Sequence, residues 1–337
     1  MKEAMLYRQE KNAGVICQLC SHRCAISDGS AGICGVRVNE NGTLYTLVYD
    51  KIVAQHVDPI EKKPLYHVLP GSLSYSIATV GCNFRCLNCQ NYEISQIPGR
   101  HSRAIPGVPI TPEEIVNAAL RNRCQSIAYT YTEPTIYFEL AYETARLAKR
   151  KGLKNLFVTN GYMTAEALET IQPYLDAANV DLKGFNEPKY RKVCGGTLEL
   201  VKETIRRMND LGVWVEVTTL VIPTHNDSET ELRAIAEFIA SVNPAIPWHV
   251  SAFHPQYKMA HIPQTSPGII YRAVDIGKEV GLWHVYSGNL RSDETSTTLC
   301  HHCGTPLIRR SGFFVVENAV AQGQCPNCDA PVGGIFL

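Results

Sequence analysis

The sequence predicts an α/β fold, a partial (β/α)6 TIM-like barrel with small N-terminal and C-terminal lobes. Two observations support this prediction. Short apolar segments alternate with helix-forming segments through the middle of the chain, and thirteen cysteines lie mainly in three groups. Strands that alternate with helices form parallel sheets, and about six such units suggest a barrel or part of one. In such a fold the functional side chains gather at the carboxyl ends of the strands.

Seven short, largely apolar segments are the predicted strands. They cover residues 75–80, 126–131, 155–159, 178–182, 213–222, 248–253 and 282–286. Helix signals lie between them. Thr111 and Glu114 have the spacing of a capping box, and Ser228 and Glu231 repeat it. Residues 134–151 place apolar side chains on one face and are a further predicted helix.

The cysteine groups divide the chain into three predicted domains. Residues 1–70 are a cysteine-rich N-terminal lobe, and residues 71–293 are the partial barrel. Residues 294–337 are a C-terminal module that resembles a zinc ribbon, with one strand predicted over 312–317. We find no internal repeat that would favour another architecture.

The composition excludes some classes of protein. Lysine plus arginine equals aspartate plus glutamate, at 32 each, which counts against nucleic acid as a partner. The first residues are charged and lack the apolar core of a signal peptide, and no stretch approaches the ~18 apolar residues of a membrane span. A cytoplasmic location without membrane attachment is therefore expected. There, close cysteine pairs indicate metal binding rather than disulfides.

The central cysteine group directly follows the first predicted strand. Cys82, Cys86 and Cys89 form a C-x3-C-x2-C pattern. Thiolates are the usual ligands of iron–sulfur clusters, and a [4Fe–4S] cluster normally takes four. A local trio leaves one iron open to the amino nitrogen and carboxylate oxygen of S-adenosylmethionine (SAM). The alternative is a zinc site or an ordinary electron-transfer cluster, although zinc needs a fourth ligand and favours paired C-x2-C spacing.

The chain here resembles the radical SAM superfamily, and in particular the enzymes that activate pyruvate formate-lyase. The segments 58–67 and 69–71, followed by the cysteine loop with Gln90 and Asn91, also resemble the radical SAM enzyme of the AmmeMemoRadiSam system. The resemblance implies a [4Fe–4S] cluster that reductively cleaves SAM. The product, a 5′-deoxyadenosyl radical, would then abstract hydrogen from a substrate.

The resemblance also implies a set of SAM-binding residues at the predicted strand ends. Tyr131, Thr132 and Glu133 stand where the superfamily has Gly-Gly-Glu, and Glu133 would receive the SAM amino group. The others are Asn160 near the ribose, Asp181 and Lys183 near the methionine carboxylate or the ribose, and the ligand-side His254. Asn88 replaces the aromatic residue that usually precedes the third cysteine, so we expect an altered adenine pocket.

The two flanking cysteine groups predict further metal sites, one in each lobe. The C-terminal group has two C-x2-C pairs, which favour zinc but also suit iron, and its members are Cys300, Cys303, Cys325 and Cys328. The N-terminal group has less standard spacing and could hold zinc or a second iron–sulfur cluster, with zinc favoured, and its members are Cys17, Cys20, Cys24 and Cys34. His22 is an alternative ligand there.

Three hypotheses follow for the function. The first is an oxidoreductase-type enzyme that, like the activating enzymes, abstracts hydrogen from a partner protein. The second is radical modification of a small molecule together with the partner proteins of the same system. The third is a non-enzymatic iron–sulfur and zinc-ribbon binding module. The enzyme hypotheses require a low-potential electron donor of the flavodoxin or ferredoxin type.

Overall fold

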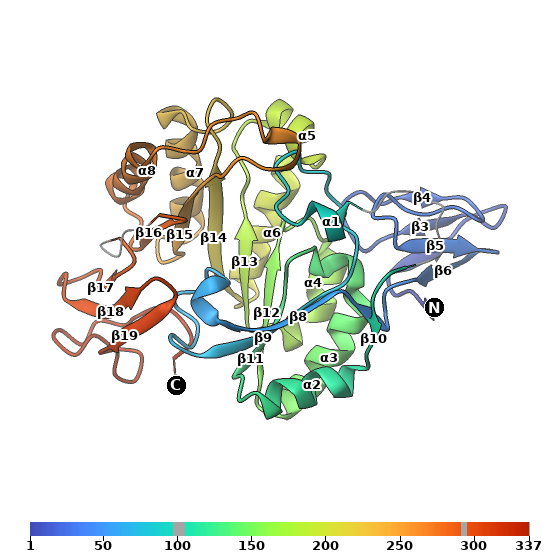
Figure 1. Cartoon of the computed structure of the whole chain (residues 1–337), viewed down its shortest axis with the longest axis horizontal. Helices are drawn as coiled ribbons and strands as arrows, with labels where there is room; N and C mark the ends of the chain where they lie inside the picture. The colour runs from blue at the N-terminus through green and yellow to red at the C-terminus, as the bar shows by residue number, and fades with distance from the viewer. Residues whose placement is uncertain (97–104, 291–294, 337) are drawn as a thin grey trace.

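The computed structural model describes residues 1–96, 105–290 and 295–336. Its centre is an eight-stranded sheet in the order β16-β15-β14-β13-β12-β11-β9-β8 (Figure 1). The pairs from β9 to β16 are parallel, and β8 pairs antiparallel with β9 at the edge. The strands are β8 (Ala54–Pro59), β9 (Leu73–Ala78), β11 (Ser126–Tyr129), β12 (Lys154–Thr159), β13 (Ala177–Asp181), β14 (Trp214–Val221), β15 (Trp248–Ala252) and β16 (Val285–Gly288).

The seven predicted strands are all present, within a few residues of their expected ends. The sequence did not reveal β8, because polar and apolar residues are mixed along it and all but Asp58 are half-exposed or exposed. Strands that neighbour in sequence also neighbour in the parallel part of the sheet. A mixed α/β fold with a parallel core is therefore confirmed, while its description as a partial barrel with metal-bound lobes stays a prediction.

The helices lie between the strands in chain order. They are α1 (Tyr92–Ser95), α2 (Pro112–Arg121), α3 (Phe138–Arg150), α4 (Ala165–Ile171), α5 (Glu187–Cys194), α6 (Leu198–Asp210), α7 (Glu229–Val242) and α8 (Pro267–Val280), with short 3-10 turns η1 (Ile60–Lys62), η2 (Pro134–Tyr137), η3 (Gln172–Tyr174) and η4 (Tyr257–Met259). Thr111 closes the predicted capping box with Glu114 at the start of α2, and Ser228 caps α7. The predicted helix over 134–151 is confirmed as η2 followed by α3.

The face of the sheet that carries Ala128, Leu156 and Ala177 is covered by the segment between β8 and β9. Ile60, Leu65, Val68 and Leu69 form a small apolar cluster with those strand residues. Ile335, near the C-terminus, packs on the same cluster. Its carbonyl oxygen accepts a hydrogen bond from the backbone N–H of Leu69. The C-terminal segment is thus packed against the segment between β8 and β9.

A buried polar network continues this covered face. The carboxylate of Glu216, in β14, accepts hydrogen bonds from the backbone N–H groups of Tyr66 and His67 and contacts His249 at 2.6 Å. Arg310, from the C-terminal module, donates to the carbonyl oxygen of Tyr66 at 2.7 Å and lies 3.7 Å from Glu61. The C-terminal module is therefore anchored to the buried segment that covers this face of the sheet.

The cysteine-rich ends lie on opposite sides of the main sheet (Figure 1). The N-terminal end contains two small sheets, β1-β6-β5 and β2-β3-β4, and β7 pairs with β10. Their strands are β1 (Lys2–Glu3), β2 (Tyr7–Gln9), β3 (Val15–Cys17), β4 (Ala25–Ile26), β5 (Arg37–Glu40), β6 (Thr43–Thr46), β7 (Lys51–Ile52) and β10 (Val108–Pro109).

The C-terminal end is a three-stranded sheet of β17 (Thr298–Leu299), β18 (Pro306–Ser311) and β19 (Phe314–Asn318). The strand predicted over 312–317 is partly wrong, because residues 312 and 313 form the turn that precedes β19. Of the predicted domain boundaries, the one at 293 and 294 lies outside the described residues. No helix in the described ranges is long and apolar enough to cross a membrane.

Candidate active site

A cleft lies at the carboxyl ends of the parallel strands and encloses about 1280 Å³, part of it open to solvent. Side chains from the carboxyl ends of β12 to β15 and from the loops after β9, β11, β12, β13 and β16 line it, together with the segment between β8 and β9. The sequence-predicted residues among them are Cys82, Cys86, Cys89, Tyr131, Thr132, Glu133, Asn160, Asp181 and Lys183. The fold therefore brings together residues that are up to 101 positions apart in the sequence, from Cys82 to Lys183.

The cysteine loop is held in place by its backbone. The N–H of Arg85 donates to the Cys194 carbonyl oxygen at 2.8 Å, and the N–H of Leu87 donates to the Val193 carbonyl oxygen at 2.9 Å. Gly81, before the first cysteine, has a φ of 98°, and a Cβ there would lie 2.8 Å from a methyl carbon of Val36. Only glycine fits this position.

The three thiols of the loop have different surroundings. Burial raises the pKa of Cys82, and it raises the pKa of Cys89 although Ser95 lies 3.1 Å from that sulfur. A hydrogen bond with the Cys194 thiol lowers the pKa of Cys86. Cys194 itself is buried behind the loop and does not line the described cleft. Its position does not match that of a thiol facing a substrate.

Glu133 ties the end of β11 to the end of β12. One carboxylate oxygen accepts hydrogen bonds from the backbone and hydroxyl of Thr135 and from the hydroxyl of Thr159. The other, Oε2, accepts from the N–H of Asn160 at 2.8 Å. Burial raises the pKa of Glu133, and these hydrogen bonds oppose the rise. Among the described residues Oε2 accepts this one hydrogen bond, so one of its two lone pairs is still available to a donor.

Tyr131 replaces the first glycine of the family motif and adopts a glycine-like backbone. Its φ is 64°, in the left-handed region that side chains disfavour. Three contacts compensate for this strain: its hydroxyl donates to Asp58 at 2.6 Å, its ring lies 4.6 Å from the ammonium of Lys63, and its carbonyl oxygen accepts from Asn91. The segment around residue 58 therefore supports the cleft through Tyr131.

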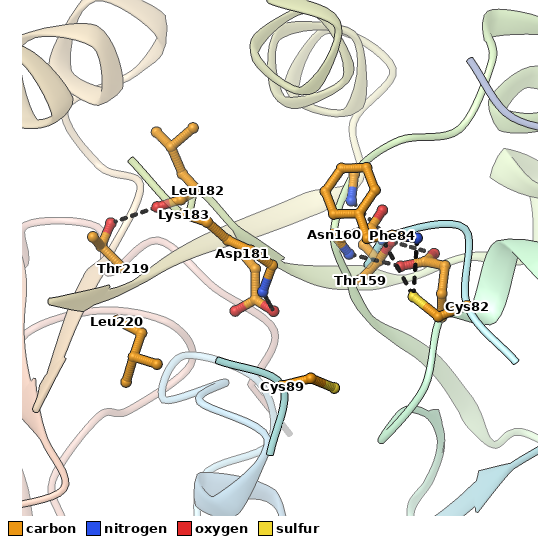
Figure 2. A network of polar contacts seen from close by, with 12 residues as sticks. Cys82, Phe84, Cys89, Thr159, Asn160, Asp181, Leu182, Lys183, Thr219 and Leu220 are labelled. Carbon is orange, nitrogen blue, oxygen red and sulfur yellow. Dashed lines mark hydrogen bonds and ion pairs between the residues drawn. The ribbon is translucent and has the colours of Figure 1, made fainter. Parts of the chain in front are cut away.

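Asp181 and Lys183 form an ion pair inside the cleft, with Nζ and Oδ2 2.8 Å apart (Figure 2). Both side chains are partly exposed to the cleft. Burial alone would lower the pKa of Lys183, but the Asp181 carboxylate and the nearby cysteine thiols outweigh it and raise the pKa well above its ordinary value. Lys183 is therefore a fixed positive charge beside the cysteine loop.

Asn160 connects the end of β12 to the cysteine loop. Its Nδ2 donates to Asn83 Oδ1 at 2.7 Å and lies 3.9 Å from the sulfur of Cys82 (Figure 2). Two buried oxygens of the cleft, Asn88 Oδ1 and Thr218 Oγ1, have no hydrogen-bond partner among the described residues. Buried polar groups without partners are rare, and they mark places where a ligand can bind.

His254 does not take part in this arrangement. Its side chain is exposed, and it is absent from the described residues that line the cleft. Sequence reasoning missed Lys63, Thr218, Ser251 and Asn289, which do line it. The register of the sheet could have indicated Thr218 and Ser251. Thr218 is in β14, which pairs with the strand of Asp181, and Ser251 is in β15, which pairs with β14.

The two flanking cysteine groups differ in geometry. The four sulfurs of Cys300, Cys303, Cys325 and Cys328 lie within 4.8 Å of one another, which makes this a four-cysteine site able to hold a metal. The four N-terminal cysteines line a separate, small cavity. Its other walls are mainly the side chains of Leu19, Ile26, Ile33, Arg37 and Ile136.

Comparison with known proteins identifies the cleft. The model of the Radical SAM superfamily matches residues 76–239, which include the cysteine loop and the ends of β11 to β13. The chain belongs to the radical SAM superfamily. A protein of Methanocaldococcus jannaschii described as uncharacterised is 44% identical over 331 residues, which cover 97% of this chain and 98% of that protein.

More distant radical SAM relatives have assigned functions. The pyruvate formate-lyase-activating enzyme of Clostridium pasteurianum is 22% identical over 190 residues, 53% of this chain and 76% of that enzyme. The crystal structure of a radical SAM methyltransferase from Sphaerobacter thermophilus aligns with a TM-score of 0.50 at 14% identity, over 66% of this chain and 68% of that one. This structural likeness shows a shared fold.

Membership of the radical SAM superfamily makes this chain an enzyme and implies a [4Fe–4S] cluster and SAM as its cofactors. The hypothesis of a non-enzymatic binding module is therefore wrong. The substrate and the role of each residue are not determined by the family, and they are the subject of the proposal below.

Proposed function

We propose that Cys82, Cys86 and Cys89 hold the [4Fe–4S] cluster and that SAM binds beside it in the cleft. The observation that supports this most strongly is that all three thiols face one cleft at the carboxyl ends of parallel strands, within the matched part of the chain. When bound, the cluster and SAM supply a 5′-deoxyadenosyl radical that abstracts hydrogen from the substrate.

The donor set fits such a cluster. A [4Fe–4S] cluster normally has four thiolate ligands, and Cys82, Cys86 and Cys89 are the cysteines among the described lining residues. The Cys194 thiol hydrogen-bonds with that of Cys86, but Cys194 is not among those lining residues. One coordination position is left for SAM, and the unpartnered oxygens of Asn88 and Thr218 provide acceptors for a polar ligand.

The cleft residues then have distinct roles in holding SAM. Lys183, kept positive by Asp181, binds the methionine carboxylate or a ribose hydroxyl. The free position on Glu133 Oε2 accepts a hydrogen bond from the SAM amino group, beside the backbone turn of Tyr131 and Thr132. Asn160 is held by Asn83 at the wall between β12 and the cysteine loop, which suits a ribose contact.

Asn88 is the proposed acceptor for the adenine amino group. It precedes the third cysteine, its side chain is buried, and its oxygen has no partner among the described residues. An aromatic residue would stack at this place, whereas an amide can only hydrogen-bond. His254 is exposed and stays outside this set of contacts.

We propose a protein as the substrate, with hydrogen taken from a glycine of a partner chain. The cleft is large and open on one side, as access by an extended segment requires. The named relative from Clostridium pasteurianum is an activating enzyme, which supports this class of substrate. The second candidate is a small molecule handled together with partner proteins, and both candidates need a low-potential donor of the flavodoxin or ferredoxin type.

We propose zinc in the C-terminal four-cysteine site. Two pairs of sulfurs, Cys300 with Cys328 and Cys303 with Cys325, are 3.7 Å apart. Tetrahedral coordination at about 2.3 Å places sulfurs about 3.8 Å apart, which matches this spacing. We also describe the main sheet as a partial (β/α) barrel with metal-bound lobes, because its consecutive parallel strands carry the cleft at their carboxyl ends.

The proposed activity is tested by anaerobic reconstitution with iron and sulfide, followed by SAM and dithionite. The expected product is 5′-deoxyadenosine, and Cys86→Ala should lose it entirely. Cys124→Ala is the matched control, because Cys124 is buried away from the cleft. If the reduced protein forms no 5′-deoxyadenosine, or if Cys86→Ala still forms it, the proposal is wrong.

The substrate class needs a second experiment. The active enzyme is mixed with candidate partner proteins, and electron paramagnetic resonance is used to look for a persistent glycyl radical on the partner. Such a radical supports the protein substrate. A product found only on a small molecule, with no radical on any partner, supports the second candidate instead.

A further inference from the structure

The four N-terminal cysteines come together from three short segments. Cys17 ends β3, Cys24 directly precedes β4, and Cys34 lies in the turn before β5. The N–H of Cys17 donates to the Cys24 carbonyl oxygen at 2.9 Å, and Cys20 forms a bridge with Met163 of the main domain. The fold therefore gathers the whole set at one place beside the parallel sheet.

The sulfurs of this set are spaced differently from those of the C-terminal set. A single tetrahedral metal ion requires sulfurs about 3.8 Å apart. The C-terminal sulfurs have this spacing, and they are the set found within 4.8 Å of one another among the described residues. The N-terminal sulfurs do not converge in this way, although all four line the same cavity. Iron–sulfur clusters also take four thiolates, but they distribute them over several irons and so require wider spacing.

The cavity between the N-terminal sulfurs is small, but its chemistry suits a cluster. Four thiols line it, and its remaining walls are mostly aliphatic. Gly32 keeps its wall free of a side chain, since a Cβ there would lie 3.7 Å from the sulfur of Cys24 and 3.2 Å from Ile26.

Arg37 supplies a polar group at the same cavity. It is 1% exposed and pairs with Glu139 at 3.1 Å, yet its Nε has no hydrogen-bond partner among the described residues. A buried N–H of this kind can donate to cluster sulfur, and such hydrogen bonds are a recognised means of setting cluster potentials.

We propose that Cys17, Cys20, Cys24 and Cys34 hold a second iron–sulfur cluster, with Arg37 donating to it. The proposal takes the iron–sulfur alternative that the sequence left open, in place of the zinc that was favoured there. The inference is independent of the activity proposed above, because it depends on a different set of cysteines.

The second cluster would lie against the loop of the first. The ring of His22 contacts the Asn83 carbonyl oxygen at 2.8 Å, so this histidine faces the cysteine loop and leaves the ligation to the four thiols. The guanidinium of Arg85 donates to the carbonyl oxygens of Ile33 and Cys82, which connects the two loops directly. A one-electron donor of the ferredoxin or flavodoxin class could therefore reduce the second cluster, which would be oxidised again as it passes that electron to the first.

The metal content of a protein without the first cluster tests the proposal. Cys82, Cys86 and Cys89 are all replaced by Ala in the full chain, and iron, acid-labile sulfide and zinc are measured after anaerobic reconstitution. We expect iron and sulfide to remain, with about one zinc per chain. A protein with no iron or sulfide and about two zinc ions per chain would overturn the proposal, whatever the enzyme activity proves to be.

A second variant guards against misfolding of the N-terminal lobe. Cys17→Ser with Cys20→Ser should lose the second cluster's share of iron and keep the zinc, whereas Cys124→Ala should keep both. If the double variant does not fold, the metal content of the variant without the first cluster still tests the proposal. Arg37→Met, which keeps all four thiols, should shift the reduction potential of the remaining cluster in the triple-Ala background, and an unchanged potential would contradict the role of Arg37.

The proximity of the clusters has a spectroscopic signature. When both clusters are reduced, their unpaired electrons should interact and broaden the electron paramagnetic resonance spectrum of the wild-type protein. The spectra of the two single-cluster variants should then fail to add up to that of the wild type. A wild-type spectrum equal to the sum would contradict the placement of the two clusters side by side.

Discussion

The two ends of the chain each carry four cysteines, yet the structure arranges them in different ways. At the C-terminal end two equivalent turns, closed by backbone hydrogen bonds from Gly304 to Cys300 and from Asp329 to Cys325, bring four sulfurs together around one point. At the N-terminal end the sulfurs surround a cavity. The positions of the sulfurs, rather than their number, therefore distinguish a site for one ion from a site for a cluster.

The two ends also contact different parts of the enzyme. The C-terminal module reaches the covered face of the sheet through Arg310 and Ile335, away from the cysteine loop. The N-terminal lobe contacts the cysteine loop itself through His22 and Arg85. This difference suggests a structural role for the C-terminal site and a redox role for the N-terminal one.

The largest effect is expected from removing the C-terminal metal. Cys300→Ser with Cys303→Ser should release about one zinc per chain and unfold the module, because structural zinc contributes on the order of 10 kcal/mol to folding such modules. Hydrogen exchange should show lost protection in β17 to β19, while the iron content stays unchanged. Loss of iron in place of zinc would reverse the assignment of the two ends.

The next effect concerns Arg310, which links that module to the sheet. Arg310→Met leaves the buried carboxylate of Glu61 without its partner, so we expect a loss of about 3–5 kcal/mol in the free energy of unfolding. Arg309→Met is the matched control, since its ion pair with Glu317 is exposed and should contribute less than about 1 kcal/mol. Equal losses in the two variants, measured by urea unfolding, would show that the module is not anchored through Arg310.

A smaller effect should appear as a pH dependence of stability. Burial lowers the pKa of His67 and of His284 to about 3, from an ordinary value of 6.5. The unfolded chain then binds protons that the folded chain does not, so stability falls as the pH falls below about 6.5. Two such histidines together predict a loss of roughly 2 kcal/mol between pH 6.5 and 5.5.

Urea unfolding at the two pH values measures this loss. His284→Phe should remove about half of it, because one of the two titrating groups is gone. An unchanged dependence in this variant would show that other groups cause it. The Nδ1–H of His67 donates to the Gly333 carbonyl oxygen, so the effect reports on the face that the C-terminal segment covers.

The smallest effect concerns the cleft. Asn88→Ala removes the proposed acceptor for adenine and should weaken SAM binding by roughly 2–10-fold, the worth of one neutral hydrogen bond. Titration calorimetry on the anaerobically reconstituted protein measures it. Glu93→Ala, at an exposed position of α1 that does not line the cleft, should bind SAM as the wild type does. If the Asn88 variant binds SAM with the affinity of the wild type, Asn88 does not contact the adenine.

Local signals made much of the fold predictable. The capping box of Thr111 depends on residues only three apart in the sequence. The apolar strands can be recognised from their own residues, without reference to the rest of the chain. The strand β8 was missed because its residues are mixed in polarity and mostly exposed, and pairing with β9 at the edge of the sheet determines its structure. The cysteine loop and its neighbours at the strand ends were predicted because parallel strands end at one edge.

Long-range contacts explain what the sequence could not show. The pairing of Glu61 with Arg310 joins residues 249 positions apart, and no local pattern indicates it. The left-handed backbone of Tyr131 depends on Asp58 and Lys63, which stabilise it from another segment. His254 follows a strand of the sheet, as expected, but its side chain points outward, and residue spacing alone does not determine that direction.

The central claim is that the cluster of Cys82, Cys86 and Cys89 has one iron open to SAM in the cleft. The most direct test uses the Cys17→Ser, Cys20→Ser variant, so that the first cluster alone is observed. Electron paramagnetic resonance is recorded on the reduced protein without SAM and with SAM labelled by ¹⁵N at its amino group. The account predicts a changed spectrum and a hyperfine coupling to the labelled nitrogen, whereas identical spectra with no such coupling would contradict it.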